Sequence, residues 1–352
     1  MFYLKEQLNT RTVEKKVALK DVAQHIGVSA ALVSYVLNGK EKEARVGADM
    51  AKKIKKAAEE LKYRPNLIAK SLKMGTTKTI GLIVADISNP FFSTIARIIE
   101  DEAKKHGYVV IFGSSDESAE KQLDLIDVFS VRLVDAFIIA PAADTEDQIE
   151  TIIKRGIPVV LMDRFFPGVK VDCVHINNFN AAGKAVKQLI KNNRKKIGMV
   201  AYDTMQSHMQ ERKQGYKAAL KENNIRFKKD WLIEASYQNI EKDVAAKLKL
   251  LLKPLQVDAL FFATNSLAVA GLKEINKLGI KVPDELAIIS FDQSDAFDFF
   301  YSPVTYVSQS LSDVGNEAVK LILNKLHNKS KKNSEVIVEA KLIVRESCGS
   351  KQ

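Results

Sequence analysis

The chain has 352 residues, 46% of them hydrophobic, which is enough for two or three domains with substantial cores. Its formal charge is +11, and residues 15–78 alone hold 15 Lys and Arg against 6 Asp and Glu, so an acidic partner is expected at this end. No apolar run approaches about 20 residues, so we expect no membrane span. No secretory signal is recognisable and only two distant cysteines occur, so we expect a cytoplasmic protein without disulfides.

The first predicted elements follow a polar tail over residues 1–16. They are two short helices, from about Leu19 to His25 and from about Ala30 to Leu37, joined by a tight turn. Gly27 can take the positive φ that such a turn requires, and Ser29 can cap the second helix through its hydroxyl group. This helix-turn-helix unit is the one that places a helix in the DNA major groove.

A third helix, from about Ala48 to Leu61, combines apolar residues at helical spacing with many lysines. Pro65 then breaks the chain, and residues 66–72 form a short candidate helix before the linker at 75–77. An isolated helix of this length is unstable in water, so it needs DNA or a partner chain to form. The N-terminal part is therefore divided into a tail (1–16), a headpiece (17–64) and a hinge helix with its linker (65–78).

From Thr79 onward, buried-strand patterns alternate with amphipathic helices in two successive series. The first has strands at 80–87, 108–115, 136–141 and 159–163 and helices at 91–106, 119–132 and 147–155; the second has strands at 197–202, 231–236, 259–264 and 286–292 and helices at 209–223, 240–252 and 267–278. This alternation predicts an α/β fold of two similar lobes, each a parallel sheet with helices on both faces. Ligands of such folds bind at the carboxyl ends of the strands, which here means a cleft between the lobes.

Over residues 17–347 the chain resembles the lactose/galactose-repressor (LacI/GalR) family of transcription regulators. The resemblance is carried by the segments LKDVAQHIGVS, VSYVLNG, LKYRPNLIAKSLKMGTTKTIGLIVADISNPFF, GIPVVLMDR, ERKQGYKAAL, LKEINKLGIKVPDELAIISFD and LIVRES. It implies an N-terminal all-α helix-turn-helix headpiece, a hinge helix and a two-lobed core of parallel sheets like that of periplasmic binding proteins. The implied core spans 79–349, with a first lobe at 79–177 and 309–328, a second lobe at 178–308 and 329–347, and a crossing near Gln309.

The resemblance also implies which residues meet DNA. The second helix would be the recognition helix, with Ala30, Ala31 and Tyr35 toward the base edges. Family members more often have Arg where this chain has Tyr35, and because Tyr cannot make the paired hydrogen bonds by which Arg reads guanine, a different half-site is expected. The alternative is that Tyr35 packs against the headpiece core. The full expected set is Ser29, Ala30, Ala31, Ser34, Tyr35, Asn38, Asn66, Ala69, Lys70, Leu72 and Lys73.

Within the hinge, Leu72 matches the residue that the family wedges between base pairs in the minor groove, which bends the duplex. Ala69 would let two hinge helices approach closely, and Lys70, Lys73 and Lys78 would face phosphates. Ordinary packing of Leu72 against the core is the alternative.

Candidate effector ligands lie at strand ends, where charged and amide groups flanked by aromatic rings suit a polyhydroxylated molecule. They are Asp86, Phe91, Phe92, Asp116, Asp163, Arg164, Arg212, Asn265 and Asp292. By resemblance, Arg212, Asn265 and Asp292 match the strongest ligand-contacting positions, although Asp292 and Arg212 could equally form an inter-lobe ion pair. Ser266 departs from the Asp usual in the family. Phe297, Phe299 and Phe300 are expected in the core or at the lobe interface rather than in an aromatic wall of the cleft.

These expectations predict a sequence-specific transcription repressor whose affinity for a palindromic operator is controlled by a small effector, a sugar or sugar derivative. A palindromic site requires a homodimer. No catalytic residue, cofactor or metal site is expected, because nucleotide-binding, P-loop and zinc-protease motifs are missing and the histidines are scattered. An effector-activated transcription factor, an effector acting as co-repressor, and a sugar-binding protein without a DNA role remain as alternatives.

Overall fold

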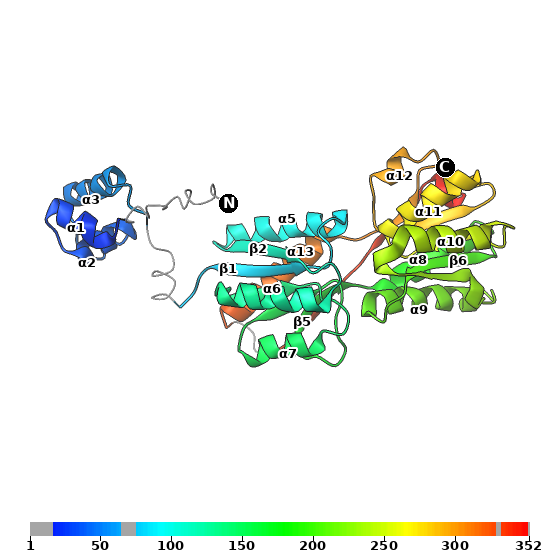
Figure 1. The fold of residues 1–352 in the computed structure, drawn as a ribbon, viewed down its shortest axis with the longest axis horizontal. Coiled ribbons are helices and arrows are strands. Elements are labelled where there is room, and N and C mark those ends of the chain that lie inside the picture. The colour runs from blue at the N-terminus through cyan, green and yellow to red at the C-terminus, as the bar shows by residue number, and fades with distance from the viewer. Residues whose placement is uncertain (1–16, 65–74, 329–331, 351–352) are drawn as a thin grey trace, which may run out of the picture. The chain divides into compact units, whose positions relative to one another are not determined.

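The computed structural model describes residues 17–64, 75–328 and 332–350 and divides the chain into two compact units, one ending at Thr77 and one beginning at Lys78 (Figure 1). The predicted tail at 1–16 and most of the predicted hinge lie outside the described residues. This applies to the expected DNA contacts Asn66, Ala69, Lys70, Leu72 and Lys73.

The first unit contains the three predicted helices, α1 (Leu19–Ile26), α2 (Ala30–Leu37) and α3 (Ala48–Glu60). They pack around Val22, Val33 and Ile54, whose side chains are fully buried. Gly27 has φ +69°, the left-handed conformation that the turn was predicted to need. The Leu32 N–H donates to Ser29 Oγ at 3.2 Å, so the predicted cap of α2 is also confirmed.

The first lobe of the second unit is a six-stranded, all-parallel sheet. Its strand order is β11 (Glu335–Val338), β5 (Asp172–Ile176), β4 (Val159–Met162), β3 (Ala136–Ile139), β1 (Thr79–Val84) and β2 (Val109–Ser114). Two pairs of helices pack on it: α5 (Pro90–Lys105) with α13 (Leu311–Leu326), and α6 (Ala119–Val131) with α7 (Glu146–Lys154), the latter pair against the buried face of Ile83, Phe137 and Leu161 (Figure 1).

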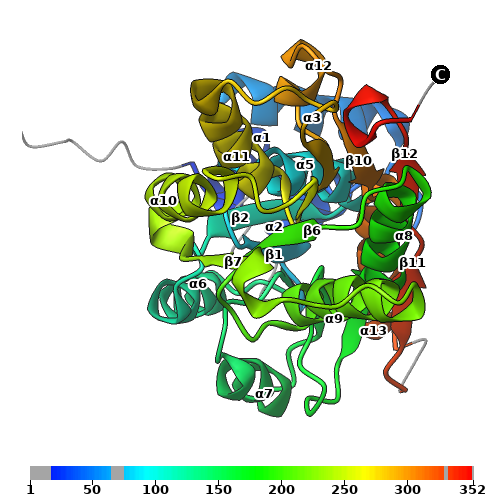
Figure 2. The same ribbon diagram turned by 90° about the vertical axis from the view of Figure 1, so that its right-hand side faces the viewer.

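The second lobe repeats this plan. Its sheet has the order β12 (Lys341–Ile343), β10 (Thr305–Ser308), β9 (Ala287–Phe291), β8 (Ala259–Phe262), β6 (Ile197–Tyr202) and β7 (Leu232–Ala235), and only the β12–β10 pair is antiparallel. Helices α8 (Asn178–Lys191) and α9 (Ser207–Glu222) pack together, as do α10 (Ile240–Leu252) and α11 (Asn265–Leu278), and Figure 2 shows the sheet between the two pairs. The short helix α12 (Ala296–Phe299) completes the lobe.

The chain passes between the lobes three times, after β5, after β10 and after β11. The crossing near Gln309 was predicted, and α13 indeed packs in the first lobe. The assignment of all of 329–347 to the second lobe is wrong, because β11 pairs in parallel with β5 of the first sheet before the chain reaches β12. Among the described residues, no helix combines the length and apolarity that crossing a bilayer demands.

Candidate functional site

The helix α2, predicted to be the recognition helix, presents one exposed face. Ala30, Ala31 and Asn38 are exposed, and the Tyr35 side chain is 47% exposed, so Tyr35 does not pack into the headpiece core. Asn38 Nδ2 donates to the Ser34 carbonyl oxygen at 2.8 Å, which fixes both residues at the end of the helix. The side chains expected to meet base edges therefore point away from Val33 and Val36, which face the core.

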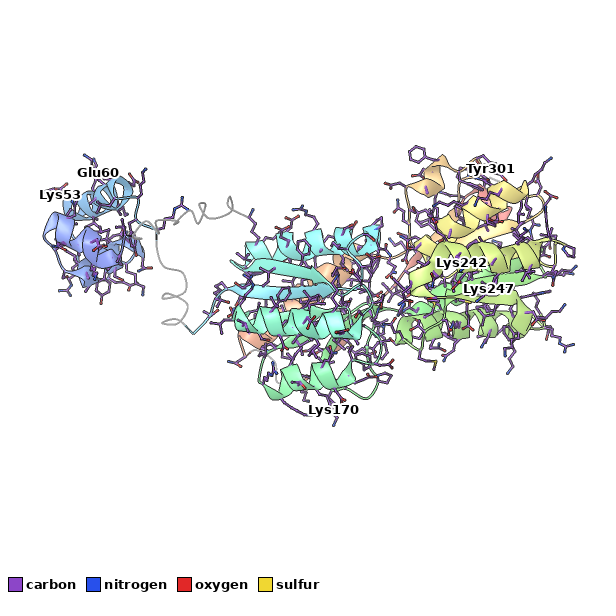
Figure 3. The ribbon with its side chains drawn as sticks, in the orientation of Figure 1. Lys53, Glu60, Lys170, Lys242, Lys247 and Tyr301 are labelled. Carbon is purple, nitrogen blue, oxygen red and sulfur yellow. The ribbon has the colours of Figure 1, made fainter. Side chains whose placement is uncertain are left out.

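Helix α3 carries four lysines and three acidic residues of the headpiece. Its core-facing residues alternate with exposed ones, among them Lys53 and Glu60 (Figure 3). Part of the charge is paired, since Lys55 Nζ lies 3.0 Å from Glu41 Oε1, and such exposed pairs contribute about 0–1 kcal/mol. Lys78 behaves differently from the expectation that it faces phosphate, because its Nζ donates to the Tyr108 hydroxyl at 3.2 Å and lies over that ring.

In the second unit a cleft lies where the carboxyl ends of the two sheets face each other, as predicted. The space in it that is open to the centres of water-sized molecules is about 30 Å³, room for a few water molecules, so a larger ligand must move side chains or the lobes apart. The lining residues come from both lobes and from the crossing segment. They are Asn89, Phe91, Phe92, Asp163, Arg164, Tyr202, Thr204, Gln206, His208, Arg212, Tyr237, Thr264, Asp292 and Gln309.

Arg212 of α9 is the most deeply buried cation of the cleft. Its Nε donates to Asn178 Oδ1 at 2.9 Å, its Nη1 donates to the Ala263 carbonyl at 2.7 Å, and its guanidinium lies 3.6 Å from the centre of the Phe291 ring. Burial lowers the Arg212 pKa, partly offset by the Asp292 carboxylate. The side chain is thus held rigidly before any ligand arrives.

Asp292 follows β9 and faces Arg212, with 3.8 Å between Oδ2 and Nη1. Gln309 Nε2 donates to its other oxygen. Burial raises the pKa of Asp292 to about 6, against the lowering effect of Arg212 and Gln309. Both members of this ion pair belong to the second lobe, so the alternative of an inter-lobe pair is wrong.

The corresponding aspartate of the first lobe, Asp163 after β4, lies beside Arg164. Arg164 Nε donates to Asp163 Oδ2 at 3.1 Å, and its Nη1 donates to both carboxylate oxygens of Glu117 at 2.8 and 2.7 Å. Burial lowers the Arg164 pKa, but the Glu117 and Asp163 carboxylates raise it further, so the net shift is upward. The same Nη1 donates to Gln206 Oε1 of the second lobe at 2.9 Å, so this network reaches across the cleft.

Two pairs of aromatic rings also line the cleft. Phe91 and Phe92, at the start of α5, lie edge to face with centres 4.8 Å apart. Tyr202 and Tyr237 of the second lobe are stacked at 4.6 Å, and burial raises the pKa of Tyr202 to about 12. Such rings cover the C–H faces of a bound molecule while the charged groups fix its polar edges.

His208 is a buried polar group of the cleft lining without a hydrogen bond to Nδ1 from any part of the chain that the structure describes. Burial lowers its pKa well below the ordinary value, and the neighbouring guanidinium groups of Arg164 and Arg212 lower it further. The ring is therefore neutral near pH 7, with one nitrogen able to bond a ligand.

Three of the predicted effector ligands do not line this cleft. Asp86 accepts bonds from the backbone and hydroxyl of Ser88, and Asp116 pairs with Lys121, so both are used in local turns. Asn265 lines a neighbouring, more open hollow, and its Nδ2 donates to Asn89 Oδ1 across the lobes at 3.2 Å. The structure brings the other six together: Phe91, Phe92, Asp163, Arg164, Arg212 and Asp292.

The aromatic cluster after β9 is divided between core and surface. Phe297 and Phe300 are buried, as predicted, but Phe299 is 88% exposed on α12, so its placement in the core or lobe interface is wrong. With only 4 residues, α12 has a single face against the lobe, and Phe299 lies on the other. Ser266 donates to Asn265 Oδ1 through its backbone N–H at 2.8 Å and lines the neighbouring hollow.

Several cleft residues were not among the predicted ligands. Tyr202 and Thr264 end or follow strands in the same way as Asp292, so their positions after β6 and β8 were a usable signal. Gln206, His208 and Tyr237 lie in loops or at a helix start, and Glu117 reaches Arg164 across 47 residues. No local pattern marks such contacts.

Two sequence profiles match this chain. Residues 18–66 match a profile described as bacterial regulatory proteins of the lacI family, and residues 77–346 match one described as periplasmic binding proteins and sugar binding domain of the LacI family. The chain is 30% identical over 330 residues to the HTH-type transcriptional repressor PurR of Vibrio vulnificus, covering 94% of this chain and 98% of that protein.

Solved structures share the fold. The lac repressor dimer bound to operator and the anti-inducer ONPF superimposes with a TM-score of 0.84 at 20% identity, over 95% of this chain and 99% of that one. A LacI-family regulator of Enterococcus faecium with bound ribose superimposes with a TM-score of 0.67 at 25% identity, over 76% of this chain and 98% of that one.

Proposed function

The chain belongs to the LacI family of bacterial regulatory proteins and is a DNA-binding repressor controlled by an effector, and we propose that the effector is an uncharged, polyhydroxylated molecule of the sugar class. The relative that contains ribose supports the sugar class. We assign the protein to the cytoplasm, where it meets chromosomal DNA, and give it no catalytic role.

On the DNA side, the exposed face of α2 reads the major groove through Ala30, Ala31 and Tyr35. The two alanines offer only apolar contact, for example to thymine methyl groups, and Tyr35 offers a ring edge and one hydroxyl. Ser29 and Asn38 cap the two ends of α2, Ser34 lies within the helix, and all three supply polar contacts beside these. A sugar-binding protein without a DNA role has no use for such a unit.

The operator is a palindrome read by a homodimer, which is the assembly named for the lac repressor structure. In the proposed complex the two hinge segments pair in the minor groove, with Leu72 as the wedge, Ala69 at the close approach and Asn66, Lys70 and Lys73 toward the backbone. The cost of unstacking one base step is a few kcal/mol, repaid by the protein surface that the bent duplex contacts.

The charge balance of the cleft is the observation that carries the effector assignment. Arg164 and Arg212 already face three carboxylates, those of Glu117, Asp163 and Asp292, all nearly or fully buried. A phosphate group needs unpaired guanidinium forks or exposed backbone N–H groups, and neither cation has its fork free. An uncharged ring with hydroxyl groups can instead exchange hydrogen bonds with these groups without adding charge.

Effector control follows from the two lobes. A ligand that contacts both stabilises one closure angle, and it shifts DNA affinity only as far as it prefers that angle over the others. If the ligand-stabilised closed form is the conformation in which the dimer binds the operator, the ligand acts as a co-repressor. If the open form binds the operator, the ligand acts as an inducer.

Thermal unfolding of the full-length chain against matched sugars and their phosphate esters tests the effector assignment. We expect at least one free sugar to raise the unfolding temperature, and its phosphate ester to fail. A phosphate ester that stabilises more than the free sugar, or stabilisation only by planar heteroaromatic bases, overturns it. Gel-shift titration of DNA upstream of the gene, with the full chain and with a chain lacking residues 1–78, tests the repressor assignment independently.

A further inference from the structure

A cluster of three metal-ligating side chains lies at the edge of the first sheet and outside the effector cleft. Cys173 and His175 are on β5, and Glu335 is on the neighbouring strand β11, where it pairs in register with Cys173. Since residues two apart on a strand share a face, this register places all three side chains on one side of the sheet. A thiol sulfur, an imidazole nitrogen and a carboxylate oxygen from them lie within 4.8 Å of one another.

Both ring nitrogens of His175 face oxygen atoms. Its Nδ1 lies 3.0 Å from the Ile176 carbonyl oxygen, and its Nε2 lies 2.8 Å from Glu335 Oε1. A carbonyl oxygen only accepts, so Nδ1 carries the proton of a neutral ring, and the lone pair of Nε2 then faces a carboxylate that also only accepts. Either a second proton or a metal ion must lie between Nε2 and Glu335.

The cluster is buried except at Glu335. Cys173 and His175 are buried, and the Phe165 ring lies 4.5 Å from the centre of the imidazole. The Glu335 side chain is the exposed member of the cluster, so an ion can reach the site from solvent.

We propose that Cys173, His175 and Glu335 bind a divalent transition-metal ion of the zinc type, with water as the fourth ligand. Thiolate, imidazole and carboxylate are the ligands that zinc takes, and an Nδ1–H bonded to a backbone carbonyl is the usual outer-shell partner of a histidine ligand. Tetrahedral ligands at zinc distances are roughly 3.4 Å apart, so Nε2 and Oε1 must separate by a few tenths of an ångström. The Glu335 side chain is 53% exposed and free to make that movement.

Binding releases the proton of the Cys173 thiol to solvent, because the metal takes the sulfur as a thiolate. The bound ion ties β11 to β5. Both strands run directly into crossings between the lobes, β5 into α8 and β11 into β12. The site is therefore placed to stiffen two of the three crossing strands.

Zinc titration of the chelator-treated full-length chain by calorimetry tests the proposal. We expect one ion per chain, and an affinity at least about tenfold weaker for Cys173→Ser and Glu335→Gln, since loss of even an outer-shell partner costs that much. Cys348→Ser removes the other buried cysteine and is the matched control that binds normally.

Cobalt provides a second readout. The cobalt complex of the unchanged chain and of Cys348→Ser should show a thiolate-to-metal charge-transfer band that Cys173→Ser lacks. If Cys173→Ser does not fold, Glu335→Gln at its half-exposed position keeps the test decisive. No zinc uptake by the unchanged chain, or unaltered uptake by Cys173→Ser, would overturn the proposal and leave His175 and Glu335 as a simple ion pair.

Discussion

Arg164 and Gln206 come from different lobes and are joined across the cleft, with Arg164 Nη1 donating to Gln206 Oε1 at 2.9 Å. Gln206 Nε2 also donates to the Pro141 carbonyl of the first lobe at 3.1 Å. Its Nε2 also donates to Glu117 Oε2 at 3.5 Å, so one side chain at the start of α9 bonds three residues of the opposite lobe. Removal of the Gln206 side chain should therefore change the angle between the lobes more than the fold of either lobe.

Gln206→Ala is expected to open the effector-free core. A hydrogen bond to a charged partner contributes about 1.5–3 kcal/mol, which is enough to shift a closure equilibrium more than tenfold. Small-angle X-ray scattering should show a larger radius of gyration for this variant. Gln210→Ala is the matched control, because the Gln210 amide donates to the Thr204 carbonyl oxygen within the second lobe. Equal scattering of both variants would contradict the role of Gln206.

Asp292 should make stability fall as the pH rises. Its pKa in the folded chain is raised from 3.8 to about 6, so between these values the folded state binds more protons than the unfolded state. Linkage then lowers the free energy of unfolding by roughly 3 kcal/mol as the pH passes through this window. The loss is complete above about pH 6 and absent below pH 3.8.

Urea unfolding of the unchanged chain and of Asp292→Asn between pH 4 and 7 measures this effect. The other carboxyl groups titrate in both proteins, so the difference between the two curves isolates Asp292. We expect the variant to gain relative stability with rising pH, and parallel curves would refute the raised pKa.

Tyr35 should determine part of the operator half-site. Tyr35→Phe removes only the hydroxyl group, so selection from random duplexes should return a motif with relaxed preference at one position. Tyr35→Ala removes the ring as well, so the same selection should return a different motif. A lost base contact costs about 1–3 kcal/mol. Tyr301→Phe alters a tyrosine that is 60% exposed in the other unit and should return the original motif. The same motif from Tyr35→Ala would exclude base reading by this residue.

Leu72→Ala should abolish operator bending. Without the wedge, the base step stays stacked and the extra contacts of the bent duplex are lost, so specific affinity falls while nonspecific affinity persists. Fluorescence energy transfer between the ends of a labelled operator measures the bend. Leu250→Ala, at a side chain that is 73% exposed on α10, provides the control. A fully bent complex with the variant would exclude the wedge.

Where local signals exist, sequence reasoning located the elements well. The headpiece helices are marked by Gly27 and the Ser29 cap, and α5, α6 and α10 were found within a few residues of their bounds from apolar periodicity. Strands β5 and β10 were missed. Their patterns, DCVHI and TYVS, are short and mix polar with apolar residues, because Asp172 and Thr305 make buried hydrogen bonds to the chain's C-terminal part.

The candidate site was only partly predictable for a related reason. Position after a strand identifies Asp163 and Asp292, but it does not distinguish them from Asp116, whose carboxylate turns outward to Lys121. Gln206 enters the cleft because the lobes meet, and Glu117 reaches Arg164 because the first sheet brings the ends of β2 and β4 to the same edge. Both contacts are tertiary and have no sequence period. Arg212 was predicted only from the family resemblance, because nothing in the sequence of its own helix indicates that this side chain is buried.

The position of β11 has a consequence for biosynthesis. Its partner β5 leaves the ribosome some 160 residues earlier, so the backbone edge of β5 has no neighbour until nearly the whole chain has been made. An uncovered edge strand is a template for intermolecular pairing, and a sheet completed so late folds slowly. Prematurely terminated products should therefore aggregate through the first lobe, and the nascent protein should depend on chaperones until synthesis is almost complete.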